Sequence, residues 1–204
     1  QPVDVRFRRL FGAPAADVFA AGIGHKDATV RKLSIAGLCR VGGPEELRKI
    51  ASEGSGEAKR QAARVLGEDG NGAISALLQL FQDKDPAVRG AAAEAVRVLG
   101  PKAVPGLAEL LKSDRADVRA RAAGVLATMG PAAAPASEEL LAALGDDQTT
   151  VRRRAVRALA ELGPRVIDDL VSIVKDVGDD RREEAASVLA AIGRPAAAKL
   201  EPVL

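Results

Sequence analysis

The sequence has very few of the side chains that usually carry chemistry. Its 204 residues include one cysteine, one histidine, one methionine and four phenylalanines, and no tryptophan or tyrosine. A single cysteine excludes an internal disulfide framework and a cysteine-based metal cluster. The shortage of aromatic residues argues against one large core and against stacking on nucleic-acid bases. No apolar run reaches the roughly 18 residues that a membrane-spanning helix needs, and no signal-peptide pattern opens the chain.

Charged side chains are abundant but nearly balanced in sign. They make up 28% of the residues, yet the formal net charge is only +2. A chain this close to neutrality has no global field that would attract nucleic acid or a membrane surface. We therefore expect any electrostatic specialisation to be local. The single cysteine suits the cytosol, and we expect a cytoplasmic protein without a membrane span.

What the sequence does contain is a repeat. The stretch "DPAVRGAAAEAVRVLG" returns as "ADVRARAAGVLATMG" and again as "TTVRRRAVRALAELG". Aligning the chain on the Val-Arg pair gives six copies, each with a glycine twelve residues after its first member. The first members are Val30, Ala58, Val88, Val118, Val151 and Arg181. A fixed spacing of this kind identifies an internal repeat of about 30 residues.

Each repeat is predicted to contain two helices. In the copy quoted first, Val88, Ala92 and Val96 recur at helical intervals and form an apolar stripe on one face. Asp85 is a good N-cap, and Gly100 followed by a proline is a stop signal. We call this predicted helix A, and a second apolar pattern after the glycine predicts helix B. A single pair cannot bury its stripe alone, so neighbouring pairs must stack.

The predicted fold is therefore all-α. We expect an α-solenoid, a right-handed superhelix of about seven stacked antiparallel helix pairs, that forms a single domain over residues 1–204. The approximate repeat boundaries are 1–26, 27–54, 55–84, 85–114, 115–147, 148–177 and 178–204. Length variation is confined to the turn between helix A and helix B, which gains three residues after Gly130.

The stretch "DPAVRGAAAEAVRVLG", followed by "AVPGLAELL", resembles the HEAT-repeat superfamily. It is most similar to the short HEAT-like repeats of about 30 residues that also occur in phycobilin lyases. The resemblance covers essentially the whole chain. It implies the solenoid fold, and it implies a protein-binding scaffold because family members serve mainly in that role, although a few are enzymes.

The most prominent polar feature is a ladder of basic residues, one after the first core position of each helix A. In HEAT-like families such residues and the aspartates of the adjacent turns tie successive repeats together through hydrogen bonds. The resemblance thus implies a structural role for the ladder, with ligand binding as the alternative. The residues assigned to it are Asp27, Arg31, Asp85, Arg89, Arg119 and Arg152, with Lys59 and Arg182 at equivalent positions.

Three features resemble sites but have simpler interpretations. The segment "GEDGNGAIS" at residues 67–75 mimics a calcium loop, but two essential carboxylates are missing, so we interpret it as a turn between helices A and B. His25 is the only histidine, which excludes the paired His-Glu iron ligands of HEAT-repeat hydroxylases. Cys39 occupies a small-residue position of helix A and is predicted to be a packed thiol. We expect no catalytic residue, metal ligand or cofactor, and no enzymatic activity.

The positions that change between repeats form the candidate binding surface. On helix B, acidic residues precede the first core leucine, and partly exposed apolar residues are interleaved with them. Because helix B generally lines the concave side of HEAT solenoids, we predict an acidic groove for a partner protein or peptide. The alternative is that these charges only complement helix dipoles and keep the chain soluble. The candidate residues are Glu45, Glu46, Arg48, Leu78, Gln79, Glu109, Lys112, Glu138, Glu139, Leu141, Asp168, Asp169 and Val171.

Two other functions compete with this one. Basic residues at outward positions of helix A would hold phosphates nonspecifically. The lack of tryptophan and tyrosine and the acidic groove argue against a nucleic-acid partner, and especially against a glycosylase of the HEAT-like type. A bilin-lyase-like or chaperone role is the third hypothesis, because short repeats of this kind occur in such proteins.

Overall fold

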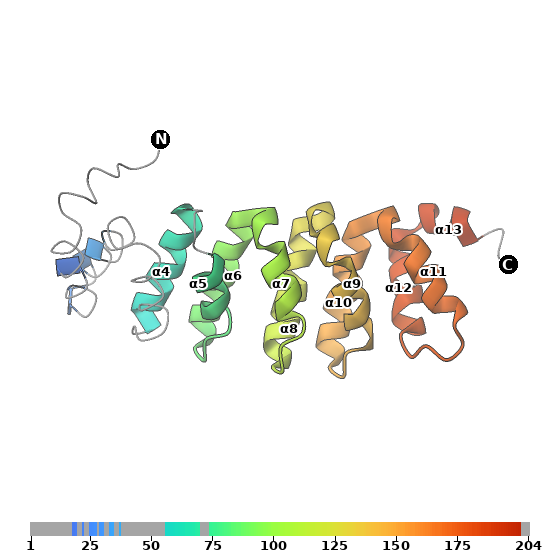
Figure 1. Ribbon diagram of the computed structural model, residues 1–204, viewed down its shortest axis with the longest axis horizontal. Helices are drawn as coiled ribbons and strands as arrows, with labels where there is room; N and C mark the ends of the chain where they lie inside the picture. Colours follow the sequence, from blue (N-terminus) through green and yellow to red (C-terminus); the bar gives the residue numbers. More distant parts are fainter. Residues whose placement is uncertain are drawn as a thin grey trace. The chain divides into compact units, whose positions relative to one another are not determined.

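The computed structural model describes residues 56–69 and 74–200, together with positions 18, 19, 22, 25–27, 29, 30, 33, 34 and 37. The chain divides into two compact units, residues 1–99 (unit 1) and 100–204 (unit 2). Every regular element that the structure describes in residues 56–69 and 74–200 is a helix, as Figure 1 shows. The predicted all-α fold of paired helices is confirmed.

Unit 1 contains a helix A, a helix B and the next helix A. They are α4 (Gly56–Asp69), α5 (Ile74–Leu80) and α6 (Pro86–Leu99). Helix α6 begins at Pro86 because the Asp85 carboxylate accepts a hydrogen bond from the Ala87 N–H at 2.8 Å and so caps the first turn. The buried stripe of α6, which includes Val88 and Ala92, belongs to a helix that packs on both α4 and α5.

Unit 2 continues the alternation of helices. Its A helices are α8 (Ala116–Met129), α10 (Thr149–Leu162) and α12 (Arg182–Ile192). Its B helices are α7 (Val104–Leu110), α9 (Ser137–Ala142), α11 (Ile167–Lys175) and α13 (Arg194–Leu200). Figure 1 shows α8, α10 and α12 in one layer of this unit and α7, α9 and α11 in the other. We call the second layer the B layer.

Short 3-10 segments connect the helices of unit 2. They are η1 (Gly100–Ala103), η2 (Gly130–Ala136), η3 (Ala143–Gly145) and η4 (Gly163–Val166). Gly163, which ends α10, has φ 66° and ψ −140°, a conformation that is essentially restricted to glycine. Segment η2 has seven residues where η1 and η4 have four, so the three extra residues after Gly130 are accommodated in this turn.

The core of unit 2 is built from small and branched apolar side chains. Ala122, Ala155 and Ala185 are fully buried at equivalent positions of the three A helices. Alanine at this position lets neighbouring A helices approach closely, and leucines such as Leu126 and Leu159 fill the remaining space. This explains how the repeats stack with so few aromatic residues in the chain.

The last helix A departs from the pattern of the preceding two. Helix α12 begins at Arg182, so the position that holds Val118 and Val151 in the preceding repeats precedes the helix and is Arg181. The Arg181 side chain is half-buried and forms an ion pair with Asp179 at 2.6 Å. Charge pairing thus replaces a buried valine in this turn.

Candidate functional site

Arg119 joins two successive turns of unit 2. Its Nη1 donates hydrogen bonds to the carbonyl oxygens of Ser113 (3.0 Å) and Asp114 (3.3 Å) in the turn before α8. Its Nε and Nη2 donate to the two carboxylate oxygens of Asp146 at 2.6 and 2.9 Å, in the turn before α10. Nη2 also donates to Asp147 Oδ1 at 2.6 Å. All three guanidinium nitrogens of Arg119 therefore have acceptors, and its positive charge is paired with carboxylates inside the stack of helices.

Arg152 repeats this arrangement one helix pair later. Its Nη1 donates to the carbonyl oxygens of Asp146 (2.9 Å) and Asp147 (3.4 Å), and its Nε donates to the Glu184 carboxylate on α12 at 2.7 Å. Asp146 therefore accepts from Arg119 through its side chain and from Arg152 through its carbonyl oxygen. The turn before α10 is held by the helices on both sides of it.

Unit 1 contains the same contact with lysine in place of arginine. The Lys59 Nζ on α4 lies 2.6 Å from Asp83 Oδ2, and both side chains are largely buried. The Arg89 Nη1 donates to the carbonyl oxygens of Asp83 and Lys84, both at 2.9 Å. Asp27 accepts hydrogen bonds from the N–H groups of two helical residues, Thr29 (2.7 Å) and Val30 (3.4 Å). Arg31 lies outside the described residues.

The ladder favours the ionised form of the Asp146 carboxylate. Burial of Asp146 would raise its pKa, but the hydrogen bonds from Arg119 and from the Gln148 N–H lower that pKa below its ordinary value. The Asp146 carboxylate in turn raises the pKa of Arg119, against the opposing effect of burial. The geometry and the charges agree with a structural use of these residues.

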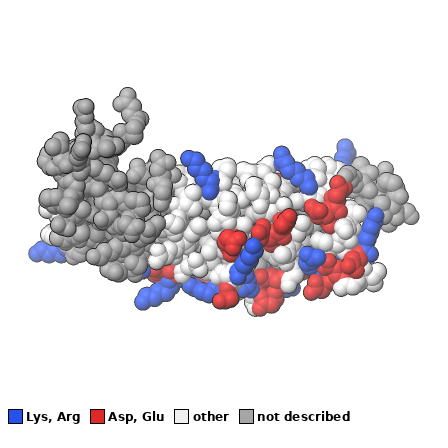
Figure 2. All heavy atoms as spheres, viewed as in Figure 1, with Lys and Arg blue, Asp and Glu red and all other residues white. Residues whose placement is uncertain are grey.

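Carboxylates gather on the B layer of unit 2, where Figure 2 shows them over α7, α9 and α11. Glu138 and Glu139 lie in the first turn of α9, and Asp168 and Asp169 in the first turn of α11. Glu109 lies on α7. Glu139 is half-buried and the other four are exposed. Three successive B helices of unit 2 thus place acidic groups on one layer.

Two apolar side chains lie among these carboxylates. Leu141 on α9 and Val171 on α11 are half-buried, whereas Ala108, at the equivalent position of α7, is buried. In unit 1 the equivalent residue, Leu78, is also half-buried, and its neighbour Gln79 is exposed. The remaining predicted binding residues, Glu45, Glu46 and Arg48, lie outside the described residues.

Lys112 connects the acidic residues of two B helices. Its Nζ lies 3.3 Å from Glu109 Oε1 and 3.2 Å from Glu139 Oε1. Hydrogen bonds to Glu139 and then to Glu109 raise the pKa of Lys112. A small cavity of about 160 Å³ adjoins it, with Leu111, Ala142 and Ala143 among its walls. The B layer therefore already holds one ammonium group between carboxylates of successive repeats.

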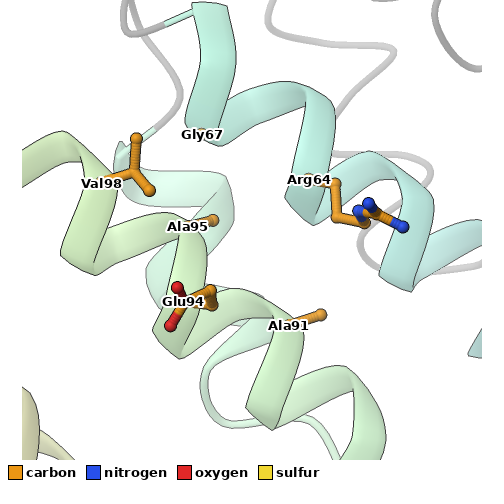
Figure 3. Close-up of a pocket in the computed structure, with 6 residues that line it drawn as sticks. All are labelled: Arg64, Gly67, Ala91, Glu94, Ala95 and Val98. Carbon is orange, nitrogen blue, oxygen red and sulfur yellow. The ribbon is translucent and has the colours of Figure 1, made fainter.

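Unit 1 has a different hollow, between its two A helices. We call it the α4–α6 trough; Figure 3 shows the six residues that line it. It has a volume of about 280 Å³ and mostly apolar walls. Its lining residues are Arg64 and Gly67 of α4 and Ala91, Glu94, Ala95 and Val98 of α6.

The described residues offer no group of three or more His, Cys, Asp or Glu side chains that would hold a metal ion. Within the same residues, no helix is both long and apolar enough to cross a membrane. The exposed His25 accepts a hydrogen bond at Nδ1 from the Asp27 N–H at 3.1 Å. Cys39 and residues 70–73 of the calcium-like segment lie outside the described residues.

Comparison with known families decides the identity of the repeat. The family model for HEAT repeats matches residues 44–127, 104–190 and 137–204. The chain belongs to the HEAT-repeat family. No curated protein matches it. The HEAT-repeat fold is typical of protein-binding scaffolds.

Solved structures of helical-repeat proteins are similar to most of this HEAT-repeat chain. A designed armadillo repeat protein in complex with the peptide (KR)4 is 16% identical, with 87% of this chain and 99% of that chain covered and a TM-score of 0.49. The complex of CpcE and CpcF of phycocyanin lyase from Nostoc sp. PCC7120 contains a chain that is 24% identical (90% and 79% covered, TM-score 0.44). The archaeal HEAT-like repeats protein from Thermococcus onnurineus NA1 is 15% identical (90% and 88% covered, TM-score 0.44). The family assignment rests on the sequence match.

The structure adds two acidic residues to the ladder of these HEAT repeats. Asp83 and Glu184 accept from Lys59 and Arg152, although neither was among the residues predicted from the sequence. A signal for Asp83 exists, because it stands five residues before Val88 as Asp146 stands five before Val151. Glu184 has no such signal, since it lies on helix α12 and not in a turn.

Proposed function

We propose that this chain is a non-enzymatic protein-binding scaffold, and that the B layer of unit 2 binds a cationic segment of a partner protein. The observation that carries the proposal is Lys112, whose ammonium group lies between Glu109 and Glu139 of successive B helices. Carboxylates with this spacing hold a lysine of the chain itself, so they are suited to hold lysine or arginine side chains of a partner.

Further carboxylates of the same layer stay available. Glu138 and Asp169 are exposed and form no ion pair with any residue in the described part of unit 2. Complementing a helix dipole accounts for acidic residues in a first turn, but it does not require the half-buried Leu141 and Val171 beside them. Apolar positions next to charged ones supply the contact area that a bound peptide needs.

The proposal is tested with a fluorescently labelled octapeptide of alternating lysine and arginine. The variant Glu138→Gln/Asp169→Asn removes two carboxylates from the B layer without changing side-chain size. The matched control, Glu161→Gln/Glu183→Gln, removes two exposed carboxylates from the A helices of the same unit. Both variants change the net charge equally, so long-range attraction falls equally in the two.

Fluorescence anisotropy at low and moderate salt gives the affinities. We expect the B-layer variant to weaken peptide binding by about five- to tenfold relative to the control, as the loss of two complementary rim charges predicts. Equal weakening in both variants would refute the B layer as the binding surface. Thermal melts of both variants check that each remains folded.

The competing hypothesis of phosphate binding by helix A has a specific basis in Arg153 and Arg157 of α10. Both are exposed and form no ion pair with the residues described around them, whereas Arg154 on the same helix donates to the Ala120 carbonyl oxygen. A filter-binding titration with single-stranded DNA, at low and moderate salt, measures this activity separately. Steeply salt-dependent binding that is lost in Arg153→Gln/Arg157→Gln would favour it.

A further inference from the structure

The α4–α6 trough of unit 1 exists because two A helices meet there through very small residues. A Cβ atom built on Gly67 would lie 2.9 Å from the Ala95 Cβ and 3.0 Å from its Cα, so the backbones are nearly in contact. Ala91 and Ala95 then leave the surface above this contact hollow. Arg64, Glu94 and Val98 stand around the hollow, as Figure 3 shows.

In unit 2, the surface between the equivalent pair of A helices, α8 and α10, is covered by a side chain of the protein itself. Arg154 of α10 extends over Gly124 of α8, with its Nη1 3.0 Å from the position a Gly124 Cβ would take, and donates to the Ala120 carbonyl oxygen at 3.0 Å. Ala91 of α6 stands at the same position of the repeat as Arg154 of α10. Between α4 and α6 the arrangement is reversed: α6 carries only the methyl group of Ala91, and Arg64 of α4 stands at the repeat position of Gly124 and lines the trough.

Val98 forms an apolar border of the α4–α6 trough. Its side chain is 62% exposed. The equivalent positions on the next two A helices hold Thr128 and Glu161, polar residues that are also exposed. A branched apolar side chain at this surface position differs from the polar residues of the next two A helices, and it lies at the border of the trough.

Among the described side chains that line the trough, the one charge without an ion pair is positive. Arg64 is exposed and forms no ion pair with any residue described in unit 1. Glu94 is bonded to Arg97, one turn further along α6, with an Arg97 Nε to Glu94 Oε2 distance of 3.1 Å, so its charge is balanced locally. The unbalanced group at the trough is thus a guanidinium, which attracts a carboxylate.

We propose that the α4–α6 trough is a docking site for an acidic amphipathic segment of a partner protein. An aliphatic side chain of that segment enters the hollow beside Val98, and an adjacent carboxylate pairs with Arg64. This inference goes beyond the proposed function, because it assigns a second surface, in unit 1, that accepts a partner of opposite charge to the one proposed for the B layer.

The probe is an acetylated and amidated 14-residue peptide with leucine at every third or fourth position and glutamate and alanine elsewhere. A second peptide has lysine in place of each glutamate. Each is titrated into the full chain, and the methyl signals of Val98, Ala91 and Ala95 are followed by NMR. We expect saturable shifts of these signals with the glutamate peptide, and at least about tenfold weaker binding of the lysine peptide.

Three variants locate the site. Ala91→Arg introduces the residue that covers the equivalent step in unit 2, and we expect it to weaken binding of the glutamate peptide at least tenfold. Arg64→Glu should reverse the preference between the two peptides, which a general loss of folding would not do. Val177→Thr, at an 82% exposed valine in unit 2, is the matched control and should change nothing.

The proposal is overturned if the glutamate peptide gives no saturable shifts, if both peptides bind equally, or if neither Ala91→Arg nor Arg64→Glu changes binding. Circular dichroism confirms that each variant is folded before it is compared. None of these outcomes bears on binding of the lysine-arginine octapeptide by the B layer of unit 2, so the two proposals fail separately.

Discussion

Arg119 and Asp146 form a two-point ion pair between successive helix pairs of unit 2, with Nε–Oδ2 and Nη2–Oδ1 distances of 2.6 and 2.9 Å. Only 13% of the Arg119 side chain and 8% of the Asp146 side chain are exposed. Such a pair combines planar geometry with partial burial, which makes removal of one partner costly because the other is left charged and desolvated.

Arg119→Ala should therefore lower the free energy of unfolding by about 2–3 kcal/mol, the loss expected for charge-assisted hydrogen bonds at a packed turn. Equilibrium unfolding in urea measures this change. Arg157→Ala is the matched control, because Arg157 is exposed on α10, and it should change stability by less than about 0.5 kcal/mol. Equal effects of the two substitutions would contradict a stabilising role of the ladder.

The ladder also predicts how stability depends on pH. Arg119 and the Gln148 N–H hold the pKa of Asp146 below its ordinary value of 3.8 despite its burial, so the folded state binds the proton more weakly than the unfolded state. The stabilisation from this carboxylate is present above pH 3.8 and is lost as the pH falls through the lowered pKa. Urea unfolding between pH 5 and pH 2 should show this decline, and Asp146→Asn should make it shallower. An unchanged slope in the variant would disprove the contribution of Asp146.

Lys112 should compete with a cationic partner for the carboxylates of the B layer. Lys112→Met frees Glu109 and Glu139, so it should strengthen binding of the lysine-arginine octapeptide about threefold, the range for one exposed ion pair. Lys175→Met removes the same charge at the equivalent position of α11, where the described residues contain no ion-pair partner for it. If anisotropy titrations show the same gain in both variants, general electrostatics and not displacement of Lys112 explains the effect.

Two glycine substitutions should have opposite effects on stability. Gly163→Ala forces a Cβ into a backbone conformation of φ 66° and ψ −140°, and should destabilise the chain by about 1–3 kcal/mol. Gly90→Ala lies within α6, where a Cβ would have no neighbour within 4 Å, and should stabilise it by about 0.5–1 kcal/mol. Thermal melts of the two variants should shift in opposite directions, and a shared direction would contradict the different backbone roles.

The helix pairs could be predicted from the sequence because their signals are local. Asp85 and Pro86 start a helix and Gly163 ends one through interactions within a few residues. The burial of Ala122, Ala155 and Ala185 follows from the same periodicity. The fixed spacing between copies then required these helices to repeat, and a repeated apolar stripe has to be covered by its neighbour.

Side-chain partners between repeats could not be predicted in the same way. The turn aspartates were the expected partners of the ladder, yet Arg152 bonds to Glu184 on the next helix. The α4–α6 trough was not predicted at all, because Ala91 is an ordinary small residue until Arg154 is seen to lie over Gly124. Both features depend on where long side chains end, and a repeat alignment does not contain that information.

The seven-residue η2 segment shows which edge of unit 2 tolerates a change in chain length. The ladder and the B layer depend on the spacing from each helix B to the next helix A, whereas η2 joins α8 to α9 and already differs in length from its counterparts. Ala133 and Ala136 of this segment are fully buried, whereas Pro131 is exposed, so a reporter domain grafted next to Pro131 would leave both charged surfaces in place. This gives an attachment point from which partner binding can be followed in the folded chain.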